Sequence, residues 1–262
     1  MIASPELIDR NYLLDDEAMK RFVTQGYHLI ELDFPLEFHE SVCQQIDAAF
    51  ERRGQPFDAI LDEVPDLQKV WDNPIVRGAL ISIMGPDFTM NSHRHCHYTK
   101  PGDQGGHWHQ DSVNSRHHLI RTVLGLYYPQ NVTDDMGPTV ILPGTQYHNT
   151  PSALMSSYMN FKNQIAMSVK AGTVAITHYD IWHSWGPNVS QKNRRMLKFL
   201  FDRGSEPTDP SWNAAPYANI GVMKRSVEID DQSAAYKHNL MWANIWRWLH
   251  GVELEDALRH NS

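Results

Sequence analysis

The hydrophobic pattern gives the chain a helical beginning. Between Asp15 and Gly26 apolar positions recur at helical spacing, with an aspartate placed to cap the start and a glycine to end the helix. A short strand over residues 27–32 should follow. Pro35 then opens a second helix whose apolar positions repeat at three and four residues as far as Gly54. We therefore expect a helical N-terminal flank over residues 1–86.

From Asp87 the pattern changes to short β-rich runs separated by Gly, Pro and Asn. The runs cover residues 88–98, 122–128, 139–142, 173–177 and 196–202. Short strands at such spacing indicate a sandwich or barrel, so we predict a mainly β core over residues 87–203 with flanking helices. Residues 204–262 then form a C-terminal extension. Its apolar positions from Leu240 to His250 have helical spacing and predict a helix that packs on the core.

Composition limits the class of protein. A chain of 262 residues can bury a full core as a single domain, and no internal repeat interrupts it. The net charge of −8 argues against a nucleic-acid-binding surface. Two cysteines cannot form a disulfide framework, and neither a signal peptide nor a membrane-spanning run is visible. We expect a cytoplasmic protein without a membrane or nucleic-acid partner.

The chemistry concentrates in His109-Gln110-Asp111 and the distant His183. On a strand, residues i and i+2 point to the same side, so His109 and Asp111 can reach one ion together. Two imidazoles and one carboxylate leave three positions open on a ferrous ion, although zinc in such a site would serve hydrolysis. A second His-x-Asp, His178-Tyr179-Asp180, lacks a comparable histidine and arginine downstream, so we prefer the first.

Two adjacent arginines follow His183. A 2-oxoacid that chelates iron keeps its far carboxylate buried, and a guanidinium matches that group with two parallel hydrogen bonds. Arg194 and Arg195 lie on the predicted strand, so only one of them can point into the core. Periodicity does not decide which one does. For Arg195 we favour a surface salt bridge or a solvated charge.

Order and spacing of the motifs resemble the phytanoyl-CoA dioxygenase family of Fe(II)- and 2-oxoglutarate-dependent oxygenases. The similarity covers about residues 15–203, and its motifs are Lys100-Pro101-Gly102, Trp108-His109-Gln110-Asp111, Asp135-Met136-Gly137-Pro138, Leu142-Pro143-Gly144-Thr145, Ala171-Gly172-Thr173 and the stretch from His183 to Arg194. Two loops depart from the family pattern, at Asp135-Met136 and at Thr145-Gln146. These departures leave the metal set intact.

The resemblance implies a double-stranded β-helix, also called a jelly roll or cupin-like fold. It implies iron held by His109, Asp111 and His183, and 2-oxoglutarate anchored by Arg194, eleven residues beyond the distal histidine. Halogenating relatives replace the carboxylate with a small residue, so Asp111 implies oxygen chemistry. The expected reaction consumes O2, converts 2-oxoglutarate to succinate and CO2, and hydroxylates the substrate. Desaturation, ring closure and demethylation stay open as outcomes.

The substrate signal is weaker. Alternation places His93, His95 and His97 on one strand face, where they line the pocket or form a solvated rim. If they line it, a polar or anionic substrate is favoured. Further pocket candidates are Trp108, Gln110 and Trp185, and further basic residues near the motif are Arg116, His117 and His118. A basic groove for acyl-CoA is not evident, so we expect a small-molecule metabolite.

Two other classes of function compete with this one. A jelly-roll metal enzyme that does not use 2-oxoglutarate, such as a cupin-type isomerase or lyase, would share the three ligands. A non-catalytic binding protein would share the fold. Arg194 separates the first rival from an oxygenase, because its expected partner is the co-substrate. The intact ligand set argues against the second.

Overall fold

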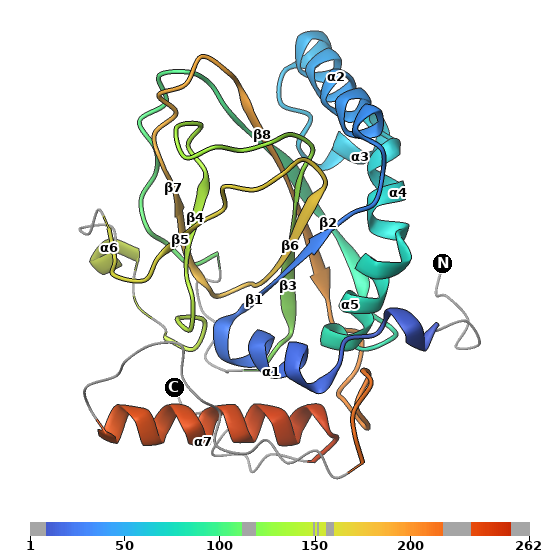
Figure 1. Ribbon diagram of the computed structural model, residues 1–262, viewed down its shortest axis with the longest axis vertical. Helices are drawn as coiled ribbons and strands as arrows, with labels where there is room; N and C mark the ends of the chain where they lie inside the picture. The colour runs from blue at the N-terminus through green and yellow to red at the C-terminus, as the bar shows by residue number, and fades with distance from the viewer. Residues whose placement is uncertain are drawn as a thin grey trace.

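The computed structural model describes residues 9–111, 119–148, 150, 152–155, 160–216 and 232–252. Two antiparallel sheets form its centre (Figure 1). The larger sheet has the order β1-β6-β3-β8-β2, and the smaller has the order β5-β4-β7. The strands are β1 (Tyr27–Glu31), β2 (Thr89–Thr99), β3 (Thr122–Tyr128), β4 (Thr139–Leu142), β5 (Ile165–Ala166), β6 (Thr173–His178), β7 (Trp182–Trp185) and β8 (Arg194–Asp202). The predicted mainly β jelly roll is confirmed.

Helices surround the sheets, as predicted. They are η2 (Arg10–Tyr12), α1 (Asp16–Gln25), α2 (Leu36–Arg53), η3 (Phe57–Ala59), α3 (Ile60–Glu63), α4 (Asp66–Asp72), α5 (Pro74–Met84), α6 (Ser152–Met155) and α7 (Gln232–Leu249). The first α-helix follows its sequence signals closely. Asp15 accepts a hydrogen bond from the Ala18 backbone at 2.7 Å, and Gly26 ends the helix at φ 80°. A glycine adopts this left-handed conformation without the steric cost of a Cβ.

The inner strands of the larger sheet, β3, β6 and β8, are buried on both faces. Along β8, Leu197, Phe199 and Phe201 point outward toward the helices that run beside the sheet in Figure 1. Trp71 of α4 packs on this outer face, with its ring centroid 4.8 Å from that of Phe199. Gly125 makes room for it, because a Cβ there would lie 2.6 Å from the Trp71 ring. The alternate residues of β3 and β8 point inward, where the cavity lies.

The C-terminal helix α7 covers one end of the molecule beneath α1 (Figure 1). Trp246 lies with its ring centroid 5.1 Å from that of Trp212, and Lys20 of α1 sits 5.9 Å above the Trp246 ring. The predicted packing helix is therefore confirmed, and it begins earlier than residue 240. Across the part of the chain that the structure describes, no helix combines the length and the apolar character that crossing a membrane requires.

Three features differ from the expectations. β1 pairs with β6, so the core sheet draws one strand from the predicted helical flank. β7 was not predicted, because Trp182-His183-Ser184-Trp185 lacks a clean alternation of apolar and polar residues. β5 has only two residues and is too short to show a period.

Candidate metal centre and cavity

Three side chains that are far apart in the sequence meet at one point. The ligand atoms of His109, Asp111 and His183 all lie within 4.8 Å of one another. His109 Nε2 is 3.9 Å from Asp111 Oδ1, and His183 Nε2 is 3.7 Å from Asp111 Oδ2. No other group of three or more His, Cys, Asp or Glu side chains in the described ranges has this arrangement. The cluster has the donor types and the proximity that one divalent ion requires.

The backbone holds the two histidines side by side. The His109 amide donates to the His183 carbonyl, and the His183 amide donates back to His109, both at 3.0 Å. His109 thus pairs as an isolated bridge with β7, whereas we expected it at a strand end. His183 lies within a strand of the smaller sheet. This pairing brings the imidazole ring centroids to 4.2 Å.

Each imidazole is fixed through its second nitrogen. Nδ1 of His109 lies 2.8 Å from the His107 carbonyl, and Nδ1 of His183 lies 2.9 Å from the Ile181 carbonyl. A carbonyl only accepts, so Nδ1 carries the proton in both rings and Nε2 presents its lone pair to the shared centre. Burial lowers the pKa of His183 to about 4, although Asp111 opposes the shift. His183 is therefore neutral near pH 7, as a metal ligand must be.

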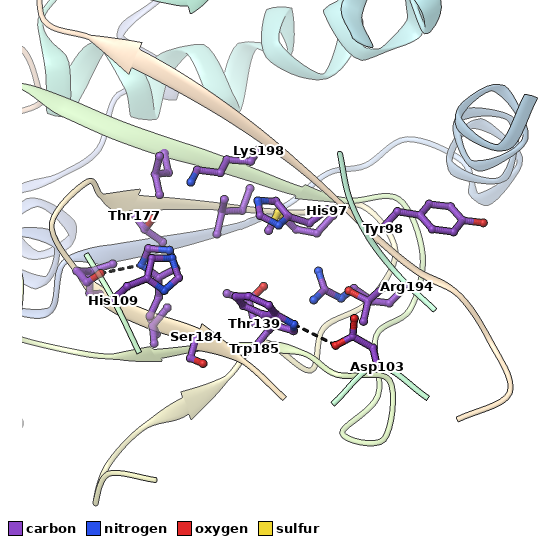
Figure 2. Close-up of a pocket in the computed structure, with 17 residues that line it drawn as sticks. His97, Tyr98, Asp103, His109, Thr139, Thr177, Ser184, Trp185, Arg194 and Lys198 are labelled. Atoms are coloured by element: carbon purple, nitrogen blue, oxygen red, sulfur yellow. Dashed lines mark hydrogen bonds between the residues drawn. The ribbon is translucent and has the colours of Figure 1, made fainter. Parts of the chain in front are cut away.

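The centre opens into a cavity of about 150 Å³ between the two sheets. Figure 2 shows His109 at one end and Arg194 at the other, with Trp185 between them. The indole Nε1 of Trp185 donates to Asp103 Oδ1 at 3.3 Å. Gly106 lets this ring approach, because a Cβ there would lie 2.2 Å from it. The remaining wall is largely apolar.

Arg194 is buried at the far end of the cavity, with 1% of its surface exposed. Its Nε and Nη2 donate to the Gly137 carbonyl at 3.1 and 2.8 Å, while buried Nη1 has no partner among the described atoms. Burial lowers the pKa of Arg194, yet a guanidinium stays charged at neutral pH. The hydroxyl of Thr139 also lines the cavity, and it makes no hydrogen bond of normal geometry. This end therefore offers unused donors to an anion.

The predicted pocket residues divide into two groups. His97 and Trp185 line the cavity. His95, Trp108 and Gln110 do not line it, which corrects the expectation for all three, although His95 contacts His97 with the two Nε2 atoms 2.9 Å apart. Trp108 packs in an apolar cluster with Val140 and Met155.

Gln110 points away from the metal centre, as alternation beside His109 and Asp111 requires. Its Nε2 donates to the Asp180 carbonyl at 2.7 Å, and its Oε1 accepts from the Thr150 amide at 3.3 Å. The side chain is thus tied to the backbone of two loops. Arg116, His117 and His118 lie outside the described residues.

Lys198 is a cavity residue that the sequence analysis missed. Its Nζ lies 2.5 Å from Asp111 Oδ2, and 7% of the residue is exposed. Burial opposes the shift, but His183 and the Lys198 ammonium together lower the pKa of Asp111. The position of Lys198 along the strand could have revealed it. Lys198 lies four positions after Arg194, so both side chains point to the same side of β8.

The second His-x-Asp motif and Arg195 lie outside the metal cluster and make contacts within the fold. His178 and Asp180 are buried 3.7 Å apart at the end of β6 and do not belong to the three-residue cluster. Arg195 points to the outer face of β8 and pairs with Asp47 of α2 at 2.6 Å. The predicted salt bridge of Arg195 is confirmed.

A family model and several solved structures are similar to this chain. The family model of phytanoyl-CoA dioxygenase matches residues 13–196, more than half of the chain. No curated protein matches. Among solved structures, SnoK, described as a non-heme α-ketoglutarate-dependent carbocyclase from nogalamycin biosynthesis, is 15% identical over 76% of this chain and 87% of its own, with a TM-score of 0.62.

Two further structures were solved with 2-oxoglutarate. HygX from Streptomyces hygroscopicus, with nickel and 2-oxoglutarate bound, is 13% identical over 72% of this chain and 87% of its own, with a TM-score of 0.61. EvdO2 from Micromonospora carbonacea var. aurantiaca, complexed with 2-oxoglutarate, is 18% identical over 75% of this chain and 94% of its own, with a TM-score of 0.58. At these identities the structures establish a shared fold.

Proposed function

Because this chain belongs to the phytanoyl-CoA dioxygenase family of Fe(II)- and 2-oxoglutarate-dependent enzymes, we propose that His109, Asp111 and His183 hold its iron and that Arg194 anchors its 2-oxoglutarate. We further propose that it hydroxylates a small-molecule metabolite within one catalytic domain over residues 1–262. A reducing compartment such as the cytoplasm would keep both the ferrous ion and the free thiols of Cys43 and Cys96 reduced.

The donor set supports the metal assignment. Two neutral imidazoles with one carboxylate suit Fe(II), and no cysteine belongs to the cluster. Both Nε2 atoms are already directed at the centre by the Nδ1 hydrogen bonds, so little reorganisation is needed for binding. Three protein ligands leave three coordination positions for co-substrate and oxygen.

One observation carries the co-substrate assignment: the unsatisfied Nη1 of Arg194 in a cavity whose other end holds the three ligands. A buried donor without a partner is costly, and a carboxylate would satisfy it. The Gly137 carbonyl fixes the guanidinium plane through two hydrogen bonds. The hydroxyl of Thr139 adds a further donor to the cavity wall.

The residues around the cavity prepare the site for oxidation. When bound, iron together with 2-oxoglutarate and O2 supplies the oxidising power, and 2-oxoglutarate is converted to succinate and CO2. Leu126, Ile141 and Met196 make part of the wall apolar and limit the water that reaches the centre. Trp185, held by Asp103, closes another side.

The polar groups near the metal centre favour a small, polar substrate. The wall there carries His97 and Lys198. SnoK is described as a biosynthetic carbocyclase, which supports a biosynthetic intermediate as the substrate here and keeps ring closure as an alternative outcome to hydroxylation. Screening small acids and biosynthetic intermediates for succinate release tests this class. Activity confined to acyl-CoA esters would reject it.

The co-substrate assignment is tested by anaerobic titration. Fe(II) followed by 2-oxoglutarate should produce the weak visible charge-transfer band of the iron chelate. Arg194→Ala should raise the 2-oxoglutarate concentration needed for half of this band by about a hundredfold, since a desolvated charge-assisted pair is lost. Arg195→Ala is the matched control and should leave the band unchanged. Iron uptake without any band in the unmodified protein would favour a jelly-roll isomerase or lyase instead.

A further inference from the structure

Lys198 stands out on the inner face of β8. The inward positions of this strand are Arg194, Met196, Lys198 and Leu200. Lys198 is opposite His95 on β2 and Leu126 on β3, in the middle of the five-stranded sheet. A lysine in such a place loses its hydration, and burial of an ammonium is unfavourable unless an anion compensates.

Asp111 is that anion. Lys198 Nζ lies 2.5 Å from Asp111 Oδ2, with 9% of the lysine and 15% of the aspartate side chain exposed. Among the described residues, no other ion pair or hydrogen bond of the Lys198 ammonium is present. Figure 2 shows the ammonium directed along the cavity toward the side that holds His109.

The other titratable groups that face Lys198 add no charge. On β2, burial and the Lys198 charge lower the pKa of His95 to about 4, and burial holds the pKa of His97 well below its usual value. On β7, His183 is likewise neutral. The hydrogen bond between His95 and His97 also requires that one ring accept and the other donate. Asp111 is therefore the one carboxylate that pairs with Lys198 in the part of the chain that the structure describes.

We propose that Lys198 is a positioning residue of the metal centre, which holds one oxygen of Asp111, leaves the other for the ion, and adds a positive charge that favours 2-oxoglutarate. This inference rests on the proposed function. Two neutral imidazoles, one carboxylate and a divalent ion carry a net charge of +1. With the ammonium the centre carries +2, which attracts the carboxylate at the chelating end of the co-substrate more strongly, while Arg194 faces the far carboxylate.

The positive charge of Lys198 affects metal binding in the opposite direction to 2-oxoglutarate binding. An ammonium bound to the ligand carboxylate withdraws charge from it and repels a divalent ion at short range. Lys198 should therefore weaken metal binding and strengthen 2-oxoglutarate binding. A lysine that merely filled space would produce neither effect, and one that merely stiffened Asp111 would strengthen metal binding.

The test compares Lys198→Met with Lys198→Arg. Calorimetric titration measures Mn(II) binding to the metal-free protein and then 2-oxoglutarate binding to the Mn(II)-loaded protein. For Lys198→Met we expect a 2-oxoglutarate dissociation constant at least about tenfold higher and Mn(II) binding as tight or tighter. For Lys198→Arg, which keeps the charge, we expect 2-oxoglutarate binding within about threefold of the unmodified protein.

Coordination supplies a readout beyond affinity. In Lys198→Met both oxygens of Asp111 are free to bind, so the visible absorption spectrum of the Co(II)-loaded protein should change, and Lys198→Arg should restore it. If Lys198→Met does not fold, Lys198→Gln provides the neutral variant, with circular dichroism as the check.

Three results would overturn the inference: equal 2-oxoglutarate affinity in Lys198→Met and the unmodified protein, an unchanged Co(II) spectrum, or loss of metal binding in a folded Lys198→Met. Failure of the proposed function looks different. In that case 2-oxoglutarate does not bind even to the unmodified, metal-loaded protein, whereas failure of the Lys198 inference leaves that binding intact.

Discussion

The adjacent residues Arg194 and Arg195 lie on opposite faces of β8 and differ in how completely they are paired. On the outer face, Arg195 forms two hydrogen bonds with Asp47, at 2.7 and 2.6 Å, and a third with Gln130 at 2.8 Å. Its guanidinium also lies 5.3 Å from the Tyr98 ring centroid. Burial opposes it, but Asp47 raises the pKa of Arg195. The outer cation is paired within the chain.

On the inner face, Arg194 is more deeply buried and has less to bind. It contacts one carbonyl through two nitrogens, and Nη1 is left without a partner among the described atoms. Burial dominates and lowers its pKa. The difference separates two kinds of buried cation. A cation whose donors all have partners within the protein stabilises the fold, whereas a cation with an unpartnered donor at a cavity can bind a ligand.

The largest effect should come from removing a metal ligand at the end of the cavity opposite Arg194. Asp111→Ala leaves two imidazoles and an unpaired Lys198 ammonium at the centre. We expect Mn(II) affinity to fall by about a thousandfold or more, because the one anionic ligand is lost and the remaining charge repels the ion. Calorimetric titration measures this fall. Metal binding within tenfold of the unmodified protein would show that the ion binds elsewhere.

Exchanging each arginine for lysine separates the two faces. Arg194→Lys keeps the charge but loses the planar pair of donors, so 2-oxoglutarate binding to the metal-loaded protein should weaken by about thirtyfold to a hundredfold. Arg195→Lys should change it by less than about twofold, since this side chain does not reach the cavity. Similar losses in both variants would mean that the contrast between the faces is structural and not functional.

A smaller effect should come from the hydroxyl beside Arg194. Thr139→Val keeps the shape of the side chain and removes Oγ1, which makes no hydrogen bond of normal geometry in the described structure. We expect 2-oxoglutarate binding to weaken by about tenfold, at the low end of the usual loss for a hydrogen bond to a charged group. Thr177→Val is a matched control, because Thr177 also lines the cavity with an unpaired hydroxyl. Equal effects of both variants on 2-oxoglutarate would contradict the placement of its far carboxylate at Arg194.

The smallest expected effect lies on the outer face. Arg195→Met removes the ion pair with Asp47, whose side chain is 39% exposed while that of Arg195 is 12% exposed. Solvent screens part of this interaction, so we expect the free energy of unfolding to fall by about 1 kcal/mol. Urea denaturation measures it, and the 2-oxoglutarate affinity of the folded variant should stay the same. Reduced 2-oxoglutarate binding without reduced stability would reverse the roles of the two arginines.

Much of the fold could be predicted because its strands carry strong local signals. The runs at 122–128 and 139–142 coincide with β3 and β4, and the caps Asp15 and Gly26 mark the ends of α1. The pairing of β1 with β6 depends on contacts across more than a hundred residues, which no local pattern reveals. β7 was missed because its four residues lack a clean alternation of apolar and polar positions, although His183 lies within it.

The site residues also divide into those with a local sequence signal and those that depend on long-range contacts. His109, Asp111 and His183 could be proposed because residue type and spacing both point to metal chemistry, and the structure brings them together. Trp108 was misplaced, since proximity to a ligand in the sequence does not say which way an indole points. Lys198 was missed because its significance depends on a carboxylate 87 residues away in the sequence. The family spacing placed Arg194, and alternation along the strand from that position would have placed Lys198 on the same face.

The central claim is tested most directly by diffraction. Crystals grown without oxygen in the presence of Fe(II) and 2-oxoglutarate should give an anomalous peak at the iron absorption edge, bonded to His109 Nε2, His183 Nε2 and one oxygen of Asp111. The difference density should run from this peak to Arg194 Nη1. A peak that His183 does not reach, or 2-oxoglutarate density that ends away from Arg194, would contradict the account.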